Sequence, residues 1–153
     1  LFQYERENPN AKVQRISFKE EIAELLKANK AFEALLVNKE GYIPEGSRSN
    51  LFFVENGIVH TAPKGNVLLG ITRKYIFDVC RELNIKTVEK SIRLEELDKV
   101  DGAFISGTSV NILPIGSIED IKLNSVDNDI IKKINKAYMD RVERYLDTKK
   151  PCN

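Results

Sequence analysis

The chain has 153 residues, a length that suits one domain with a hydrophobic core of its own. Its 24 basic and 23 acidic residues leave a formal net charge of +1, which gives no electrostatic footprint for nucleic acid or a membrane surface. No apolar run approaches the roughly 20 residues that a membrane-spanning helix requires, and nothing resembles a signal peptide. The cysteines, Cys80 and Cys152, show no metal-binding or redox spacing. We therefore expect a reduced, cytoplasmic protein without a metal.

The first residues of the chain are Leu1 and Phe2 rather than a methionine, and a polar segment follows them directly. This beginning is typical of a piece cut from a longer protein. We therefore expect that the front of the parent protein is missing. No repeat, low-complexity tract or internal linker divides the chain, so residues 1–153 are expected to form a single domain.

The first half of the chain predicts one helix and two β-hairpins. Residues 17–20 have the Ser-x-x-Glu pattern of a capping box, and apolar residues follow at helical spacing, so a helix is expected over residues 17–29. Short apolar runs then predict four strands, over residues 31–37, 42–43, 51–55 and 58–61. Turn-forming residues lie inside each pair, at 38–41 and at Asn56-Gly57, so each pair should form a hairpin.

The second half predicts helices mixed with strands. Apolar residues at helical spacing predict a helix that Asn84 can end, and Asp127 or Asn128 should cap a last helix through about Leu146. Residues 93–99 predict a short acidic helix. Strands are expected over residues 85–88, 102–105, 110–115 and 118–123, the last two extending the sheet. Hairpins together with crossovers indicate an α/β fold with a mixed sheet.

Three short segments carry residues suited to binding a small molecule, and each also has a plainer structural explanation. Glu45 stands before a run of small polar residues, where a turn needs no carboxylate. Residues 70–72, Gly-Ile-Thr, open a helix, where free N–H groups favour a phosphate, although Thr72 could simply cap the helix. Residues 106–109, Ser-Gly-Thr-Ser, follow a predicted strand. Their hydroxyls and N–H groups could form an anion-binding nest, or the segment could be a polar turn. Taken singly, the cap and the turn are the simpler interpretations.

Four further residues have reactive side chains. Lys12 lies shortly before the first predicted helix, as a surface lysine or as a lysine that forms a Schiff base. His60 has no second ligand at metal-binding spacing and is expected to be structural or solvated. Cys80 lies on the apolar face of a predicted helix and should pack in the core, whereas Cys152 lies in a polar tail.

In this order and spacing, residues 45–52, 69–73 and 106–109 resemble the fold-type IV, or class IV, pyridoxal-phosphate aminotransferases. That family includes branched-chain aminotransferases, D-amino-acid aminotransferases and 4-amino-4-deoxychorismate lyases. The resemblance covers nearly the whole chain, as the large C-terminal domain, and implies an α/β fold with a pseudo-barrel-like mixed sheet and flanking helices. It also implies a smaller N-terminal domain, absent from this sequence, and a homodimer whose partner lends residues to the site.

The resemblance implies that the chain binds pyridoxal 5'-phosphate. The cofactor-binding residues it implies are Glu45, Ser49, Asn50, Gly70, Ile71, Thr72, Gly107 and Thr108. Glu45 would keep the pyridine nitrogen protonated, so that the ring draws electrons from the substrate Cα. Ile71 and Thr72 would bind the cofactor phosphate through backbone N–H groups, with Thr108 on its other side.

The resemblance also implies a catalytic lysine. Residues 33–36 resemble the family strand that follows the lysine-bearing segment, and counting back from Glu33 without a gap reaches Lys12. As the Schiff-base lysine, Lys12 would move the proton between the substrate and the cofactor. The expected reaction is transfer of an amino group between an amino acid, of branched-chain type, and a 2-oxo acid. The alternatives are a 4-amino-4-deoxychorismate lyase, in which the same lysine eliminates pyruvate, and a non-catalytic member or assembly domain.

Overall fold

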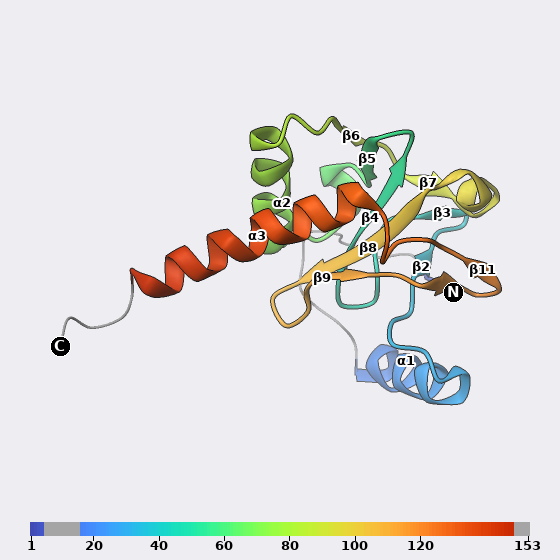
Figure 1. Ribbon diagram of the computed structural model, residues 1–153. Coiled ribbons are helices and arrows are strands. Elements are labelled where there is room, and N and C mark those ends of the chain that lie inside the picture. The colour runs from blue at the N-terminus through green and yellow to red at the C-terminus, as the bar shows by residue number, and fades with distance from the viewer. Residues whose placement is uncertain (5–15, 149–153) are drawn as a thin grey trace.

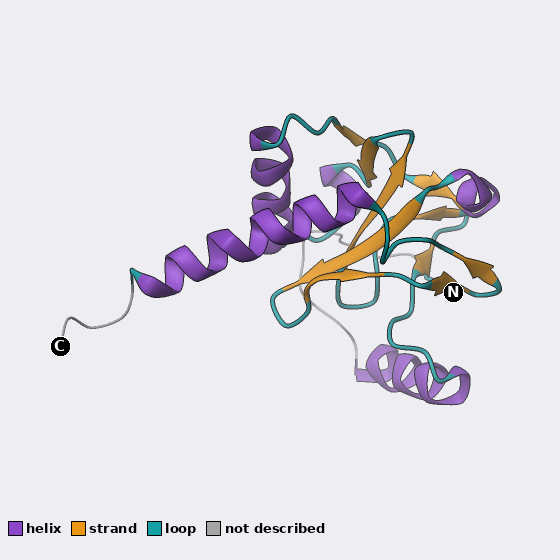
Figure 2. Cartoon of the chain, viewed as in Figure 1, coloured by secondary structure: helices purple, strands orange, loops and turns teal. Residues whose placement is uncertain are grey.

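A five-stranded mixed sheet forms the centre of the computed structural model, which describes residues 1–4 and 16–148 (Figures 1 and 2). Its strands, in spatial order, are β6 (Thr87–Glu89), β5 (Ile58–Thr61), β4 (Asn50–Glu55), β8 (Gly102–Gly107) and β9 (Asn111–Pro114). β5 and β6 run parallel, whereas the other neighbours in this sheet are antiparallel. The predicted α/β class with a mixed sheet and flanking helices is confirmed.

The β4–β5 hairpin forms as predicted from Asn56 and Gly57. Their φ angles of 49° and 79° lie in the left-handed region, which a two-residue turn matching the twist of the strands requires. The turn sets the register, so that Glu55 pairs with Ile58 and Phe52 with Thr61. The hairpin therefore fixes where the first residue of β4, Asn50, lies relative to the rest of the sheet.

Two helices, α2 (Ile71–Glu82) and α3 (Asp129–Asp147), cover one face of the sheet, and α3 extends beyond it (Figure 1). Phe52 and Phe104 pack beneath these helices in the core, with their rings stacked and the ring centroids 4.8 Å apart. Asn128 caps α3, since its side chain accepts from the first-turn N–H groups. The prediction of a cap at 127 or 128 is thus confirmed at Asn128.

The opposite face of the sheet packs against short elements. These are β3 (Tyr42–Ile43) with β7 (Ile92–Arg93), β10 (Ser117–Ile118) with β11 (Ile121–Lys122), and the 3₁₀ helix η2 (Leu94–Lys99). α1 (Ile16–Asn29) lies apart from the other helices, and packs Phe18 and Ile22 against Ala34 and Leu36 (Figure 1). The 3₁₀ helix η1 (Lys64–Asn66) lies between β5 and α2. Among the described residues, no helix combines the length and apolarity needed to cross a bilayer.

Three predictions about the N-terminal half are wrong in detail. Ser17 lies within α1, which already includes Ile16, so Ser17 does not precede the helix as a cap. Within residues 31–37 the strand is limited to β2 (Leu36–Val37), which pairs in parallel with β1 (Phe2–Gln3). The turn at residues 38–41 forms, with the Asn38 N–H donating to the Tyr42 carbonyl at 2.9 Å, but β3 pairs with β7 and not with β2, so the predicted hairpin does not form.

One prediction about the C-terminal half is wrong. Residues 118–123 do not extend the sheet, because Ser117 pairs with Lys122 in a separate hairpin whose turn places Glu119 at φ 49°. The predicted short acidic helix before Val100 is confirmed and is the 3₁₀ helix η2. The other elements lie within a few residues of their expected bounds, and Asn84 follows α2 with φ 56°.

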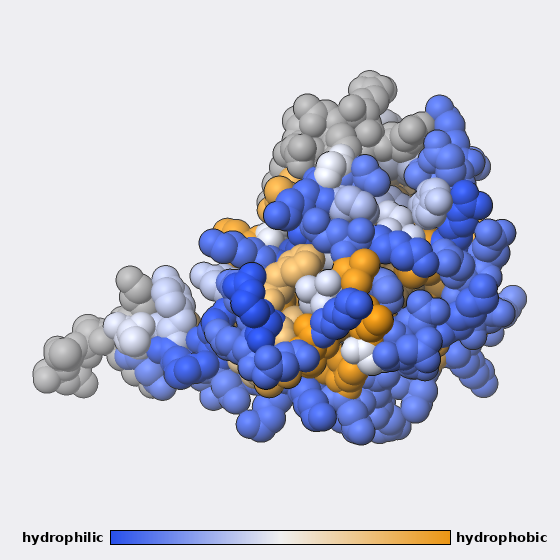
Figure 3. All heavy atoms as spheres, turned by 90° about the horizontal axis from the view of Figure 1, so that it is seen from above, coloured by the Kyte–Doolittle hydropathy of each residue, from blue (hydrophilic) through white to orange (hydrophobic). Residues whose placement is uncertain are grey.

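The surface of the protein is mostly hydrophilic in the view from above, with an apolar area enclosed by hydrophilic residues (Figure 3). Large apolar side chains are exposed at several points elsewhere along the chain. Two of them, Leu69 and Ile71, are 51% and 73% exposed beside the start of α2. Exposed apolar residues at this helix end are notable because the same segment belongs to the candidate site.

Candidate cofactor-binding site

Glu45 lies between β3 and β4 and is buried, with 3% of its surface exposed. Its Oε2 accepts a hydrogen bond from the Leu68 N–H at 3.2 Å. Its own carbonyl accepts from the Leu36 N–H at 2.9 Å, which fastens the segment to β2. A carboxylate is costly to bury, and a turn does not need one. Glu45 is therefore held inside the protein by specific hydrogen bonds and is not a solvent-exposed surface residue.

Asn50, at the start of β4, fastens the same segment from the other side. Its Nδ2 donates to the Leu68 carbonyl at 2.7 Å, and its side chain is buried. The peptide groups flanking Leu68 are thus held at the N–H by Glu45 and at the carbonyl by Asn50. Because Leu68 lies just before α2, these two bonds join Glu45 to the beginning of that helix.

α2 begins at Ile71, and its N-cap is Gly70, which supplies no capping side chain. The alternative in which Thr72 is the N-cap is therefore wrong: Thr72 is buried within the first turn. Gly70 is needed where it stands, since a Cβ there would lie 2.6 Å from Asn50 Oδ1. A helix start without a capping side chain presents N–H groups and a positive dipole end, which suit a phosphate.

The end of β8 lies beside the start of β4. Ser106 is the direct partner of Asn50 across the two strands. A Cβ on Gly107 would lie 3.7 Å from the carbonyl oxygen of Arg48, so the loop before β4 approaches this strand end closely. Thr108 is exposed in the turn to β9. The structure thus brings all three predicted segments to one end of the sheet.

The Ser106 hydroxyl is buried, with 1% of the residue exposed, and has no hydrogen-bond partner among the described residues. Of the predicted residues, Ser49 donates its hydroxyl to Glu33 at 3.0 Å. Lys12, the predicted Schiff-base lysine, and Cys152 lie outside the described residues. The position of Lys12 relative to Glu45 therefore stays a prediction.

Glu33 is a site residue that the sequence interpretation missed. Its side chain is 7% exposed, and its Oε1 accepts from the Ser47 hydroxyl at 2.5 Å. Its Oε2 accepts the hydroxyl of Ser49, two residues further along the same loop. The available signal was a glutamate directly before the apolar run of residues 34–37, a second acidic residue at the head of a buried segment.

Two hollows in the described part are lined by other residues. One, of about 640 Å³, lies between α1, residues 30–35 and the β8–β10 region. The other, of about 490 Å³, is lined in part by Tyr4, Tyr42 and Lys90. The eight predicted cofactor-binding residues line neither hollow. Four of the eight, Glu45, Ser49, Asn50 and Thr72, are buried, whereas Ile71 and Thr108 are exposed.

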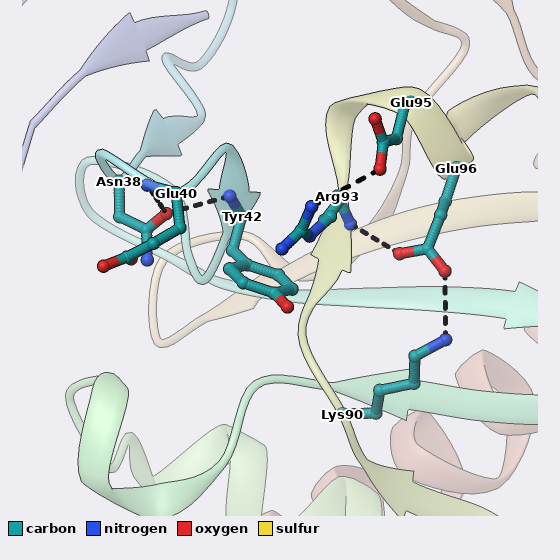
Figure 4. A network of polar contacts seen from close by, with 7 residues as sticks. All are labelled: Asn38, Glu40, Tyr42, Lys90, Arg93, Glu95 and Glu96. Carbon is teal, nitrogen blue, oxygen red and sulfur yellow. Dashed lines mark hydrogen bonds and ion pairs between the residues drawn. The ribbon is translucent and has the colours of Figure 1, made fainter.

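A second polar cluster fastens the turn at residues 38–42 to β7 and η2 (Figure 4). The Arg93 guanidinium lies 4.6 Å from the centre of the Tyr42 ring, and the Glu96 carboxylate accepts from the Arg93 N–H and from Lys90. The backbone bond from Arg93, followed by Lys90, lowers the pKa of Glu96. Asn38 accepts from the backbone within the turn itself. The cluster holds two surface segments together.

A family model described as amino-transferase class IV matches residues 1–118. The chain belongs to the class IV aminotransferases. It is 35% identical over 113 residues to the branched-chain-amino-acid aminotransferase of Pseudomonas aeruginosa, covering 73% of this chain and 37% of the relative. It is 31% identical over 135 residues to a putative branched-chain-amino-acid aminotransferase of Methanocaldococcus jannaschii, covering 86% of this chain and 47% of the relative.

Solved structures of class IV aminotransferases share the fold. The branched-chain aminotransferase from Thermoproteus uzoniensis, solved with norvaline, matches with a TM-score of 0.74 and 35% identity over 80% of this chain and 41% of that one. The enzyme from Thermobaculum terrenum in its PLP form matches with a TM-score of 0.79 and 25% identity, covering 92% and 50%. The chain spans less than half the length of the curated relatives named above.

Proposed function

We propose that this chain is the cofactor-binding, C-terminal domain of a pyridoxal-phosphate-dependent aminotransferase that moves an amino group between a branched-chain amino acid and a 2-oxo acid. The observation that carries the proposal is the pair of hydrogen bonds at Leu68, whose N–H donates to Glu45 and whose carbonyl accepts from Asn50. They place a buried carboxylate beside the uncapped start of α2. A carboxylate can keep the pyridine nitrogen of the cofactor protonated, and the N–H groups at the helix start can bind its phosphate.

The residues present fit pyridoxal 5'-phosphate, which supplies an electron sink when bound. Glu45 would hold a proton at the ring nitrogen, because a buried carboxylate favours a positively charged neighbour. The N–H groups of Ile71 and Thr72 would bind the phosphate at the start of α2. Thr108, in the turn after β8, would contribute to holding the phosphate. Gly70 and Gly107 would leave room for the backbone to approach the cofactor.

Lys12 completes the proposed chemistry by linking to the cofactor and by moving the proton at the substrate Cα. We further propose that the substrate pocket is completed by the smaller domain that the family resemblance implies, and by a second copy in a homodimer. The exposure of Ile71 and Thr108 supports this division, since catalysis needs a site from which water is excluded.

The branched-chain substrate class is inferred from the relatives, which are named as branched-chain-amino-acid aminotransferases. Solved structures of such enzymes contain norvaline or pyridoxamine 5'-phosphate. The alternative reaction, pyruvate elimination by a 4-amino-4-deoxychorismate lyase, has the same cofactor requirements and is separated from the first by its products. The aminotransferase is favoured because these relatives are all named for it.

The test uses the complete protein with added pyridoxal 5'-phosphate. Binding should give a visible absorption band, and borohydride treatment should add the cofactor mass to the peptide that contains Lys12. Leucine with 2-oxoglutarate should then give glutamate, and Lys12→Ala should abolish this turnover. Pyruvate release from 4-amino-4-deoxychorismate without amino transfer would establish the lyase instead. Absence of the band and of any cofactor-labelled peptide would overturn the proposal.

A further inference from the structure

The Glu33 carboxylate gathers hydrogen bonds from a short loop. Oε1 accepts from the Ala34 N–H at 3.0 Å and from the Ser47 hydroxyl at 2.5 Å, and Oε2 accepts from the Ser49 hydroxyl at 3.0 Å. The Arg48 Nε lies 3.7 Å from Oε2. Bonds to an ionised acceptor are stronger than those between neutral groups. The buried charge is therefore balanced by the loop at residues 46–49.

This loop is the connection between Glu45 and Asn50. Across it, the Gly46 N–H donates to the Ser49 carbonyl at 2.9 Å, and Glu45 and Asn50 form a β-bridge. A Cβ on Gly46 would lie 2.3 Å from Ser49 Oγ and 3.1 Å from Glu33 Cγ and Cδ. The loop is thus packed against the Glu33 side chain without spare room, so the position of Glu33 determines the shape of the loop.

The same loop reaches the third segment of the candidate site. The Arg48 carbonyl oxygen is 3.7 Å from the Cβ position of Gly107, and Asn50 pairs with Ser106. Arg48 also donates to the Phe32 carbonyl at 2.9 Å, directly before Glu33. Any change in the loop therefore acts at once on Glu45, on Asn50 and on the end of β8.

We propose that Glu33 is a positioning residue for the candidate site. Its carboxylate holds the loop at residues 46–49, and the loop sets the side chains of Glu45 and Asn50 that hold Leu68 at the start of α2. Glu33 acts through these residues and does not touch the cofactor. The identity of the ligand rests on the proposed function, whereas the link from Glu33 to Leu68 rests on the contacts above.

Glu33→Leu tests the proposal, because leucine keeps the approximate size and removes every acceptor. Ser47→Ala with Ser49→Ala removes the two hydroxyl bonds from the other side and serves if the leucine variant does not fold. Glu40→Leu, at an exposed glutamate in the turn between β2 and β3, is the matched control. Glu33→Gln keeps one acceptor oxygen and should restore part of the lost function.

The first measurement is amide hydrogen exchange in the complete protein without cofactor. In Glu33→Leu and in the double serine variant, exchange of the Leu68 N–H should rise about tenfold or more over the Glu40→Leu control, because its acceptor Glu45 is displaced. Protection of the Val54 N–H, near the far end of β4 from Asn50, should be unchanged, which separates a local effect from general destabilisation. Unchanged exchange at Leu68 would overturn the proposal whatever ligand the protein takes.

The second measurement is the dissociation constant of pyridoxal 5'-phosphate, read from its visible band. Loss of an orienting partner behind a ligand-binding residue typically costs on the order of tenfold to a hundredfold, so the constant should rise by about that factor in Glu33→Leu. A wild-type protein that does not bind the cofactor would defeat the proposed function, and the exchange result would still decide the role of Glu33. Equal cofactor binding by wild type and Glu33→Leu would overturn the positioning role.

Discussion

The Leu68 N–H donates to Glu45 Oε2 at 3.2 Å, across a separation of 23 residues in the chain. This bond fixes the direction of a buried carboxylate relative to the first turn of α2. It gives the carboxylate a defined orientation, which a solvent-exposed glutamate would lack. The bond is the structural basis for expecting Glu45 and the helix start to contact the same ligand.

Glu45→Gln should slow turnover strongly and leave the cofactor bound. Glutamine keeps an acceptor oxygen for Leu68 but removes the negative charge that holds a proton at the pyridine nitrogen. Loss of one electrostatic partner of this kind typically costs on the order of a hundredfold in kcat. Steady-state kinetics with leucine and 2-oxoglutarate would measure it, with Glu40→Gln as the surface control. Unchanged kcat in Glu45→Gln would show that the ring nitrogen has another partner.

His60 should make the protein less stable as the pH falls below neutral. Burial is the largest influence on its pKa and lowers it below the ordinary value of 6.5, against the attraction of Glu55 at 3.7 Å. Lys90 and Lys86 lower it further, and Glu96 raises it. The unfolded chain then binds a proton at a pH where the folded chain does not. This contribution is fully present above pH 6.5 and is lost as the pH falls toward the folded-state pKa.

Urea unfolding at a series of pH values between about 7.5 and 5 would measure this effect, because the imidazole of the unfolded chain takes up its proton near pH 6.5, within that range. His60→Gln should flatten the dependence of the unfolding free energy on pH in the same range. Its control is Lys86→Gln, which alters a neighbouring charge without removing the imidazole. A wild-type and a His60→Gln curve of equal slope would contradict the prediction.

Cys80 should be unreactive in the folded protein. It lies on the buried face of α2, in the core, and burial raises the pKa of its thiol to about 12. Thiolate, the reactive form, is therefore scarce at neutral pH. In a Cys152→Ser background, labelling with a thiol reagent should occur only as fast as the protein opens, and should become rapid in denaturant. Rapid labelling of the folded protein at neutral pH would show that this part of the core is open.

Local features of the fold could be predicted because their causes lie within a few residues. The Asn56–Gly57 turn follows from the positive φ angles that its two residues tolerate, and the cap at Asn128 follows from a side chain that reaches the next N–H groups. The pairing of Ile43 with Ile92 could not be predicted in this way. Both segments are short apolar runs, and nothing in either one specifies its distant partner.

The residues of the candidate site also differ in whether the sequence alone could predict them. Glu45 stands out in the sequence because a turn needs no carboxylate, and Gly70 and Thr72 stand out because they open a predicted helix. Leu68 does not, because it contributes its backbone N–H and carbonyl, which every residue except proline has. Glu33 was passed over because its role depends on hydroxyls 14 and 16 residues later in the chain. Contacts of this kind become visible only when the loop has been placed against the strand.

Gly70→Ala should weaken binding of the cofactor phosphate, and inorganic phosphate offers a simpler probe of the same helix start. The added Cβ would lie 2.6 Å from Asn50 Oδ1, so either the Asn50 amide or the start of α2 must move. Movement of Asn50 loses its bond to the Leu68 carbonyl, and an unpaired buried group costs about 1–3 kcal/mol. Gly65→Ala is the control, because a Cβ there has no atom within 4 Å.

A double-mutant cycle separates the steric clash from the lost hydrogen bond. Asn50→Ala should lower stability by itself, but it also removes the atom that the new Cβ would strike. In the Asn50→Ala background, Gly70→Ala should therefore cost less than in the wild type, with a coupling of roughly 0.5–3 kcal/mol, as expected for residues in contact. The measurements are urea unfolding and the affinity for pyridoxal 5'-phosphate. Additive effects of the two substitutions would show that Asn50 and Gly70 do not act as a unit at the start of α2.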